Sequence, residues 1–265
     1  MGMRIEVKDL CFSYGNKRIL DGVNVTFDEP GLYCIVGPNG VGKSTLVKCI
    51  LGIYKIESGS ILLDGHDLSE FTPKDLAQVI GFVPVTSSDI FSMSVLDTVM
   101  MGRYPHQKMG MPSEFDWKIV KRALNMMNVR HLALSDMDEL SAGQHQKVAI
   151  TKGLAQTPRV LVLDEPTSNL DAKHQLQVTE TLREIALKVG MCVIMVSHDL
   201  NLSARYADKI IVMEPPGRVY CTGTPKEVMT AETITKIYGV ECEVIEHKGR
   251  PHIILERALR ASESE

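Results

Sequence analysis

Three short runs along the chain are apolar at consecutive positions, namely residues 32–36, 160–163 and 192–196. Strands covered by helices on both faces have this pattern, whereas strands with one wet face alternate apolar and polar residues. Apolar residues at helical spacing follow the first two runs, at Leu46, Cys49, Ile50 and Ile53 and within residues 176–189. The alternation of strand and helix predicts an α/β core with a mostly parallel sheet.

Two other regions have different patterns. Residues 5–14 and 23–27 alternate apolar and polar positions, with turn-forming pairs at 15–16 and 21–22, which predicts an N-terminal antiparallel β region. Residues 86–153 favour helices, with one apolar face formed by Phe115, Ile119, Val120, Ala123, Leu124 and Met127. We therefore expect one domain: a core of about 1–85 and 154–225, an inserted helical subdomain of about 86–153, and a C-terminal extension of about 226–265.

Composition limits the class of protein. The chain has 265 residues, 44% hydrophobic and 23% charged, with a net charge of −4, as in an ordinary globular protein without an overall attraction for nucleic acid. No uncharged apolar run approaches the roughly 18 to 20 residues that span a bilayer, and the N-terminus lacks a secretory apolar region. The six cysteines form no C-x-x-C pair, which favours reduced thiols in a cytoplasmic protein.

A phosphate-binding loop follows the first buried run. Its residues match G-x-x-x-x-G-K-[ST] and are Gly37, Pro38, Asn39, Gly40, Val41, Gly42, Lys43, Ser44 and Thr45. The match lies between a predicted strand and a predicted helix, which is the context it requires. Backbone N–H groups of such a loop point at phosphate oxygens, and the helix N-terminus adds partial positive charge. We expect Lys43 to bind the β- and γ-phosphates of ATP and Ser44 to ligate Mg²⁺.

A P-loop alone does not separate kinases, GTPases, recombinases and transport ATPases. The second buried run narrows the choice, because it leads directly into Asp164 and Glu165. Ligands of open α/β sheets bind at the carboxyl ends of the strands. There, Asp164 suits a ligand or outer partner of Mg²⁺, and Glu165 suits the general base that orients and deprotonates the attacking water.

The segment 140–144, Leu-Ser-Ala-Gly-Gln, closely resembles the L-S-G-G-Q signature of ABC ATPases. Residues 168–171 resemble the D-loop of that family, and residues 197–199 its switch-histidine segment. The resemblance covers most of the chain and implies that each ATP is sandwiched between the P-loop of one copy and the signature of a second. The signature residues expected to contact that nucleotide are Ser141, Ala142, Gly143 and Gln144.

The same resemblance implies roles for two further residues. His198 would donate to the γ-phosphate, and the ring of Tyr14 would stack on adenine. Alone, a histidine at a strand end is more often structural, as is a helix-capping serine such as Ser141, but the order of motifs favours the functional roles. Ser141 is also expected to cap a helix whose positive end faces the phosphate. Ala142 replaces the usual glycine and is harmless unless the position needs a positive φ.

One family position departs from the pattern. Residues 81–84 are normally followed by a glutamine that contacts Mg²⁺ and the lytic water, and this chain has Val85. The side chain of valine can neither donate nor accept a hydrogen bond, so this ligand is missing unless Thr86, Ser87, Ser88 or a water molecule replaces it. We expect intact ATP binding with slower or differently coupled hydrolysis.

Residues 91–95 and 101–106, with later segments around Gly217, 223–225 and 238–240, look like the ATPase subunits of importers for iron-siderophore, heme and cobalamin. The resemblance implies an ATPase that forms a dimer with a second copy of itself and works with an integral membrane permease and, indirectly, a substrate-binding protein. It would lie in the cytoplasm at the inner face of the cell membrane. Two alternatives stay open: a soluble ABC ATPase acting on nucleic acid or the ribosome, and a weakly hydrolysing regulatory subunit. Nucleic acid is not expected, because the chain has neither a long coiled-coil insertion nor a second ATPase domain.

Overall fold

A parallel-rich sheet forms the centre of the molecule. The computed structural model describes residues 3–85, 93–107 and 111–259. Within them the central sheet has the order β10-β9-β3-β8-β7-β6, and only β10 runs antiparallel to its neighbour. Its strands are β3 (Gly31–Val36), β6 (Ile80–Val83), β7 (Val160–Asp164), β8 (Cys192–Val196), β9 (Lys209–Glu214) and β10 (Arg218–Gly223). Every residue of β3, β7 and β8 is buried, so the predicted core sheet is confirmed.

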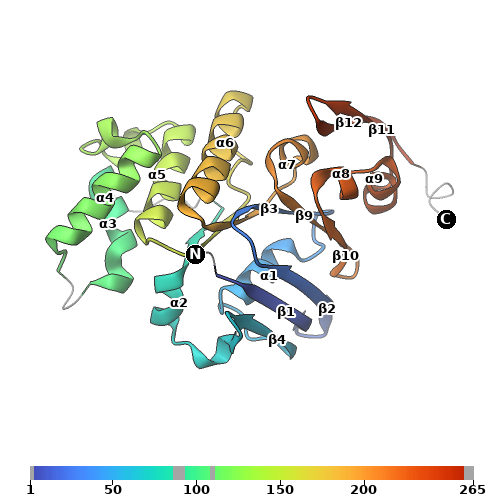
Figure 1. Ribbon diagram of the computed structural model, residues 1–265, viewed down its shortest axis with the longest axis horizontal. Helices are drawn as coiled ribbons and strands as arrows, with labels where there is room; N and C mark the ends of the chain where they lie inside the picture. The colour runs from blue at the N-terminus through green and yellow to red at the C-terminus, as the bar shows by residue number, and fades with distance from the viewer. Residues whose placement is uncertain (1–2, 86–92, 108–110, 260–265) are drawn as a thin grey trace.

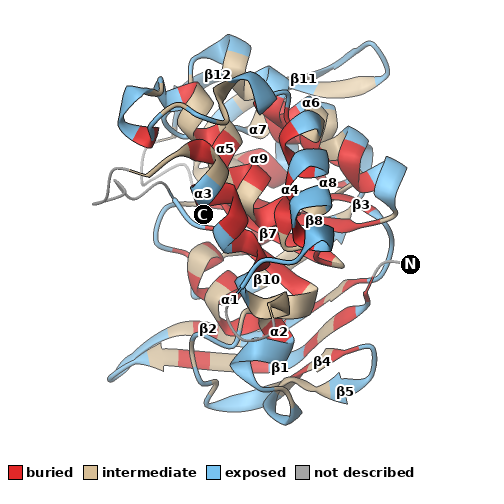
Figure 2. Ribbon diagram, turned by 90° about the vertical axis from the view of Figure 1, so that its left-hand side faces the viewer, coloured by how far each residue is buried: buried red, intermediate tan, exposed pale blue. Residues whose placement is uncertain are grey.

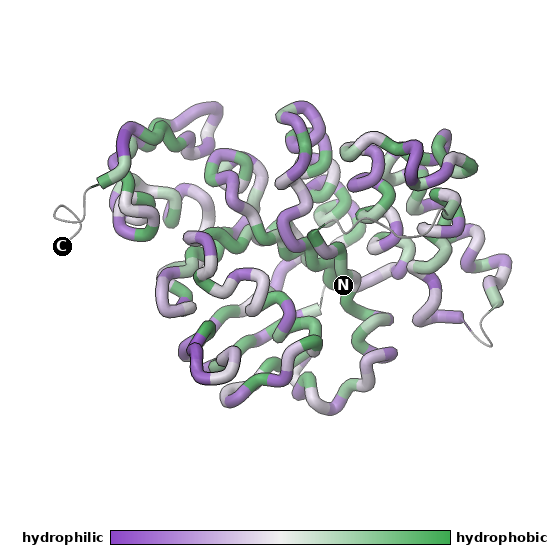
Figure 3. Tube along the Cα trace, turned by 180° about the vertical axis from the view of Figure 1, so that it is seen from behind, coloured by the Kyte–Doolittle hydropathy of each residue, from purple (hydrophilic) through white to green (hydrophobic). Residues whose placement is uncertain are grey.

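The two faces of this sheet pack against different layers. In β3, Leu32, Cys34 and Val36 face one apolar cluster, and Tyr33 and Ile35 face the other, as alternation along a strand requires. Figure 3 shows hydrophobic positions gathered in the middle of the trace, and Figure 2 shows the matching buried interior. The helices around the sheet are α1 (Lys43–Ile50), α2 (Pro73–Val79), α6 (Ala172–Val189) and α7 (Leu200–Tyr206).

The N-terminal antiparallel region has the strand order β2-β1-β4-β5. Its strands are β1 (Ile5–Tyr14), β2 (Lys17–Phe27), β4 (Ser58–Leu63) and β5 (His66–Asp67). The turn expected at Asp21 and Gly22 is wrong, because both residues lie inside β2. Gly22 has φ +63 and lies where the pairing of β2 with β1 shifts register. The positive φ therefore belongs to an irregularity within the strand and not to a turn between strands.

Helices α3 (Val95–Met100), α4 (Glu114–Met126) and α5 (Ala142–Ala155) gather at one end of the molecule (Figure 1). Short 3₁₀ helices are η1 (Leu68–Glu70), η2 (Met101–His106), η3 (Arg130–Leu132) and η4 (Met137–Glu139). Val120, Ala123 and Leu124 of α4 are buried as predicted. Phe115 is 63% exposed, and Ile53, which lies past the end of α1, is 54% exposed, so these two predicted apolar-face positions are wrong.

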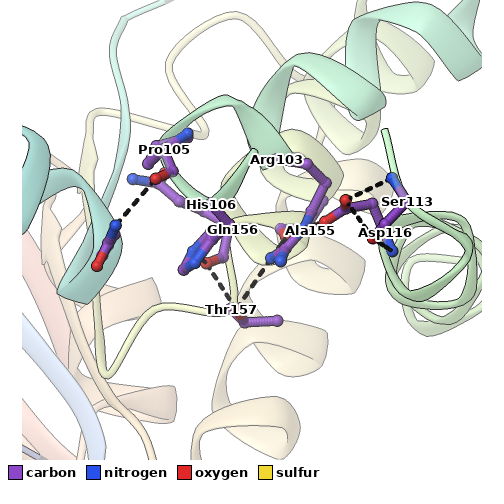
Figure 4. Close-up of polar contacts among 9 residues, drawn as sticks. Arg103, Pro105, His106, Ser113, Asp116, Ala155, Gln156 and Thr157 are labelled. Carbon is purple, nitrogen blue, oxygen red and sulfur yellow. Dashed lines mark hydrogen bonds and ion pairs between the residues drawn. The ribbon is translucent and has the colours of Figure 1, made fainter. Parts of the chain in front are cut away.

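A buried polar network ties this helical region together (Figure 4). Arg103 Nε donates to Asp116 Oδ1 at 2.9 Å, and its Nη1 donates to the carbonyl of Ala155 at 2.8 Å. Asp116 Oδ2 accepts from the backbone N–H and the hydroxyl of Ser113 at 2.9 and 2.7 Å. Arg103 therefore joins the start of α4 to the end of α5.

The C-terminal part contains α8 (Pro225–Val228), α9 (Ala231–Tyr238) and a hairpin of β11 (Val240–His247) and β12 (Arg250–Ala258). The hairpin contacts α7 through Asn201, whose amide exchanges two hydrogen bonds with the backbone of Ile253 at 2.7 and 3.0 Å. Among the described residues, no helix is both long and apolar enough to cross a membrane.

Candidate nucleotide-binding site

The loop between β3 and α1 has a backbone that only glycine accommodates at its start. Gly37 has φ +150, and a Cβ atom there would lie 2.5 Å from the carbonyl oxygen of Met213 in β9. Gly42, immediately before α1, has φ +107. The close approach of β9 and the positive φ angles fix the path of the loop, which leads directly into the N-terminus of α1.

Lys43 and Ser44, the first two residues of α1, contact different groups: Lys43 binds the loop backbone, and Ser44 binds a carboxylate. The Lys43 side chain lies along the loop, and its Nζ donates to the carbonyl oxygens of Gly37 and Pro38 at 2.7 and 2.9 Å. Burial lowers the pKa of Lys43, and the carboxylates of Glu165 and Asp164 only partly offset this effect. Ser44 Oγ donates to Asp164 Oδ1 at 2.8 Å, which brings together the two residues predicted to hold Mg²⁺.

The Ser44–Asp164 pair has the chemistry that Mg²⁺ requires. Both side chains present oxygen atoms, and burial raises the pKa of Asp164 while the Ser44 hydroxyl partly opposes the shift. Among the described residues, no group of three or more His, Cys, Asp or Glu side chains is placed to coordinate a metal ion. Mg²⁺ in phosphate sites is usually held by one or two protein ligands, with water and phosphate supplying the rest, so the pair fits that ion.

Glu165 and His198 meet at the ends of two neighbouring strands. Asp164 pairs with Val196 across β7 and β8, so the residues that follow these strands emerge side by side. His198 Nε2 lies 2.5 Å from Glu165 Oε1. Glu165 has φ +49, an uncommon conformation for a residue with a side chain, and such strain gathers at functional sites.

A cavity of about 580 Å³ unites these groups. Its lining includes the loop residues 39, 40 and 42–45, Glu165, His198 and Tyr14. Tyr14 is 47% exposed, and its ring meets the rings of Phe12 and Tyr54 edge-on, with centroid distances of 5.0 and 5.6 Å. The P-loop, Glu165, the histidine and the aromatic residue therefore share one cavity, and Asp164 joins them through its hydrogen bond with Ser44.

Lys17 and Ile19 also line this cavity, and the sequence analysis did not identify them. Lys17 pairs with Tyr14 across the β1–β2 turn, which places a cation beside the predicted adenine position. The signal in the sequence was the Gly15-Asn16 turn, which returns the chain beside Tyr14. To place Lys17 beside Tyr14 from this turn, the register of the hairpin must be known, and the alternation pattern alone does not give it.

The signature residues lie outside this cavity. Ser141 caps α5 in a capping box: its Oγ accepts from Gln144 N at 3.4 Å, and Gln144 Oε1 accepts from Ser141 N at 2.9 Å. Ala142 is the first residue of α5 and has no positive φ, so its backbone does not require glycine. A second cavity of about 250 Å³ separates Ala142 from Glu165 and the segment 168–170.

Val85 is 42% exposed and is not among the residues that line the 580 Å³ cavity. Thr86, Ser87 and Ser88, the candidate substitutes for the missing glutamine, lie outside the described residues. The effect of Val85 on hydrolysis therefore stays a prediction.

Comparison with known proteins identifies a family, several relatives and a similar solved structure. The family model described as "ABC transporter" matches residues 20–168. An uncharacterized ABC transporter ATP-binding protein of Methanocaldococcus jannaschii is 38% identical over 95% of this chain and 98% of its own length. The ferric enterobactin transport ATP-binding protein FepC of Escherichia coli is 34% identical over 92% and 90% of the two chains.

The hemin import ATP-binding protein HmuV of Bordetella avium is 35% identical over 92% of this chain and 95% of its own. Among solved structures, a chain described as belonging to a metal-chelate type ABC transporter, in an inward-facing conformation, superposes with a TM-score of 0.83. It shares 28% identity and covers 97% of this chain and 98% of its own.

Proposed function

Because the chain belongs to the ABC transporter ATP-binding family, we propose that two copies close on two ATP molecules and drive a membrane permease that imports a metal chelate or related small molecule. The chain is an ATPase subunit of the ABC type. The observation that carries the proposal is the convergence of Lys43, Ser44, Glu165 and His198 at one cavity, with Asp164 bound to Ser44 behind it.

The residues of this site divide the work of ATP hydrolysis. The loop N–H groups and Lys43 bind the β- and γ-phosphates, and Tyr14 stacks on adenine at the other end of the cavity. Ser44 and Asp164 would hold Mg²⁺, which neutralises phosphate charge when bound. Glu165 orients and deprotonates the attacking water, and His198, whose Nε2 lies 2.5 Å from Glu165 Oε1, donates to the γ-phosphate when ATP is bound.

The signature needs a second copy to act. Ser141 to Gln144 lie beyond the cavity that the P-loop lines, so they act on a nucleotide held by the partner. The Ser141 hydroxyl accepts a hydrogen bond from Gln144 and keeps its own proton to donate to phosphate. Closure on two ATP molecules places these groups on the γ-phosphates. Hydrolysis then breaks the bond between the β- and γ-phosphates, and the γ-phosphate contacts that hold the dimer closed are lost.

Glu165→Gln tests this proposal, because the amide keeps the size of the side chain and loses its basicity. Steady-state turnover should fall about 10²-fold or more, the contribution of a positioned base. ATP-dependent dimerisation, followed by sedimentation, should survive. A near-normal rate in Glu165→Gln would remove Glu165 from this role.

We assign the import of a metal chelate or related compound from the relatives, which are named for hemin and ferric enterobactin. An apolar groove of about 780 Å³ suits the cytoplasmic helix of a permease, which would hold the subunit at the inner face of the membrane. Its walls are formed by residues 51–56 after α1, by η1, by α2 and by β6. Ile53, which projects there and is 54% exposed, is a direct probe.

Ile53→Asp should abolish co-purification with the permease, because a charge would enter an apolar interface. Lys188→Ala, on the exposed face of α6, is the matched control and should co-purify normally. Recovery of only ribosomes or DNA with the wild-type subunit would contradict the transport proposal.

A further inference from the structure

The start of the signature helix lies against the first turn of α6. Gly143, the second residue of α5, is buried, and a Cβ atom there would lie 2.8 Å from Cδ2 and 3.0 Å from Cγ of His174. Carbon atoms that are not bonded pack best at about 3.5 to 4.0 Å, so any larger residue would collide with the ring. Gly143 has no positive φ, so glycine is required here by its neighbour and not by its backbone.

The imidazole of His174 is itself held in place. Asp171, the last residue of the D-loop segment, caps α6: its Oδ1 accepts from the backbone N–H of His174 at 2.9 Å. The same oxygen lies 2.9 Å from His174 Nδ1. The ring is therefore fixed on one side by Asp171 and contacts Gly143 on the other.

A second contact repeats this arrangement one turn further along both helices. Lys147, four residues after Gly143, donates through Nζ to Gln177 Oε1 at 3.3 Å. Gln177 lies three residues after His174, on the same side of α6. Two contacts along the same pair of faces hold α5 parallel to the start of α6, with His174 nearest the signature.

From these contacts we infer that His174 is a positioning residue for the hydrolysis reaction. Its ring sets the distance between the signature at the start of α5 and the D-loop before α6, so both move as one unit. The inference rests on the proposed function, in which the signature acts on the partner's ATP. It assigns Gly143 a second requirement, a flat surface for the ring of His174, beside any contact with phosphate.

The test uses Gly143→Ala, His174→Ala and the double variant. Gly143→Ala should lower kcat about 10²-fold, because misplacement by about 1 Å at an active site has this effect. The double variant should recover at least about tenfold of that loss, since the new methyl group then occupies the space left by the ring. The affinity of the isolated subunit for ATP should stay within about twofold in all variants, because that nucleotide sits on the chain's own P-loop.

A double variant with kcat no higher than that of Gly143→Ala would overturn the inference, because glycine would then be needed only for the approach of phosphate. His174→Phe keeps a planar ring and loses the contact with Asp171, and it should retain kcat within a few fold. A loss in His174→Phe as large as in His174→Ala would contradict a role for the shape of the ring. Lys173→Ala, one residue away and exposed, is the matched control.

The contact can also be measured without any turnover. In urea unfolding, Gly143→Ala should destabilise the wild type more than it destabilises His174→Ala, which has no ring to collide with. Equal destabilisation in both backgrounds would overturn the inference. Failure of the proposed function is seen separately, as a wild-type subunit that does not dimerise with ATP.

Discussion

The buried Arg103–Asp116 pair gives the strongest prediction about what holds the helical region together. Both residues are almost fully buried, at 2% and 4% exposure. Asp116→Asn keeps the size of the side chain but removes the negative charge beside Arg103, whose Nη1 still has the carbonyl of Ala155 and the hydroxyl of Thr157 as acceptors. Removing one partner of a buried ion pair costs about 3 to 5 kcal/mol. With two acceptors left, we expect the free energy of unfolding to fall by about 3 kcal/mol.

Tryptophan fluorescence can follow this loss of stability. Trp117 is the only tryptophan of the chain and follows Asp116 in α4, so fluorescence during urea unfolding follows the helical region. The double variant Arg103→Met with Asp116→Asn removes both charges, and it should lose less stability than Asp116→Asn alone. A loss below about 1 kcal/mol in Asp116→Asn, or a double variant whose loss equals the sum of the single losses, would refute the reasoning.

The same pair predicts a dependence on pH. Burial opposes ionisation of Asp116, but the N–H and hydroxyl of Ser113 and the guanidinium of Arg103 outweigh it and hold the pKa at about 2. In the unfolded chain the pKa of this carboxyl is about 3.9, so the folded carboxylate contributes stability above about pH 4 and loses it as the pH falls towards 2. The stability difference between wild type and Asp116→Asn should therefore shrink over that window. A difference that stays constant from pH 5 to about pH 2 would contradict the assigned pKa.

Two substitutions at the nucleotide site give further expected outcomes. Val85→Gln should raise the steady-state rate of ATP hydrolysis and lower the Mg²⁺ concentration that gives the half-maximal rate, because an amide oxygen can ligate the ion. An unchanged rate and Mg²⁺ dependence would show that the position is not limiting. Tyr14→Ala should weaken the binding of a fluorescent ATP analogue about tenfold, whereas Tyr14→Phe, which keeps the ring, should bind like the wild type. Equal affinity of Tyr14→Ala and wild type would remove this ring from the adenine site.

The core of the fold followed from the sequence because its strands are buried on both faces. Consecutive apolar residues such as those of β7 identify a strand without any knowledge of its neighbours, and Asp164 at its end identifies the binding edge. The pattern was less informative where helices meet solvent. Ile53 and Phe115 continue the apolar spacing and yet are exposed, because periodicity does not show where a helix ends or which positions its neighbours cover.

The parts of the site that the sequence did not predict depend on contacts between distant segments. Lys17 reaches the cavity through the register of the β1–β2 pair, and no local pattern specifies that register at Gly22. The strained φ of Glu165 is set by the turn after β7, where its carbonyl accepts from Ser168. The contact of His174 with Gly143 joins residues on two helices, and only the packed structure brings it into view.

The most direct test of the account mixes two inactive subunits, Lys43→Ala and Ser141→Arg. Each variant alone should lack ATP hydrolysis, because every dimer that it forms has either two defective P-loops or two defective signatures. A mixed dimer contains one intact pair, the P-loop of the Ser141→Arg subunit and the signature of the Lys43→Ala subunit. An equal mixture should therefore regain about a quarter of the wild-type rate, since about half of the dimers are mixed and each has one working site of two. A mixture that stays as inactive as either variant alone would contradict a site shared between two copies.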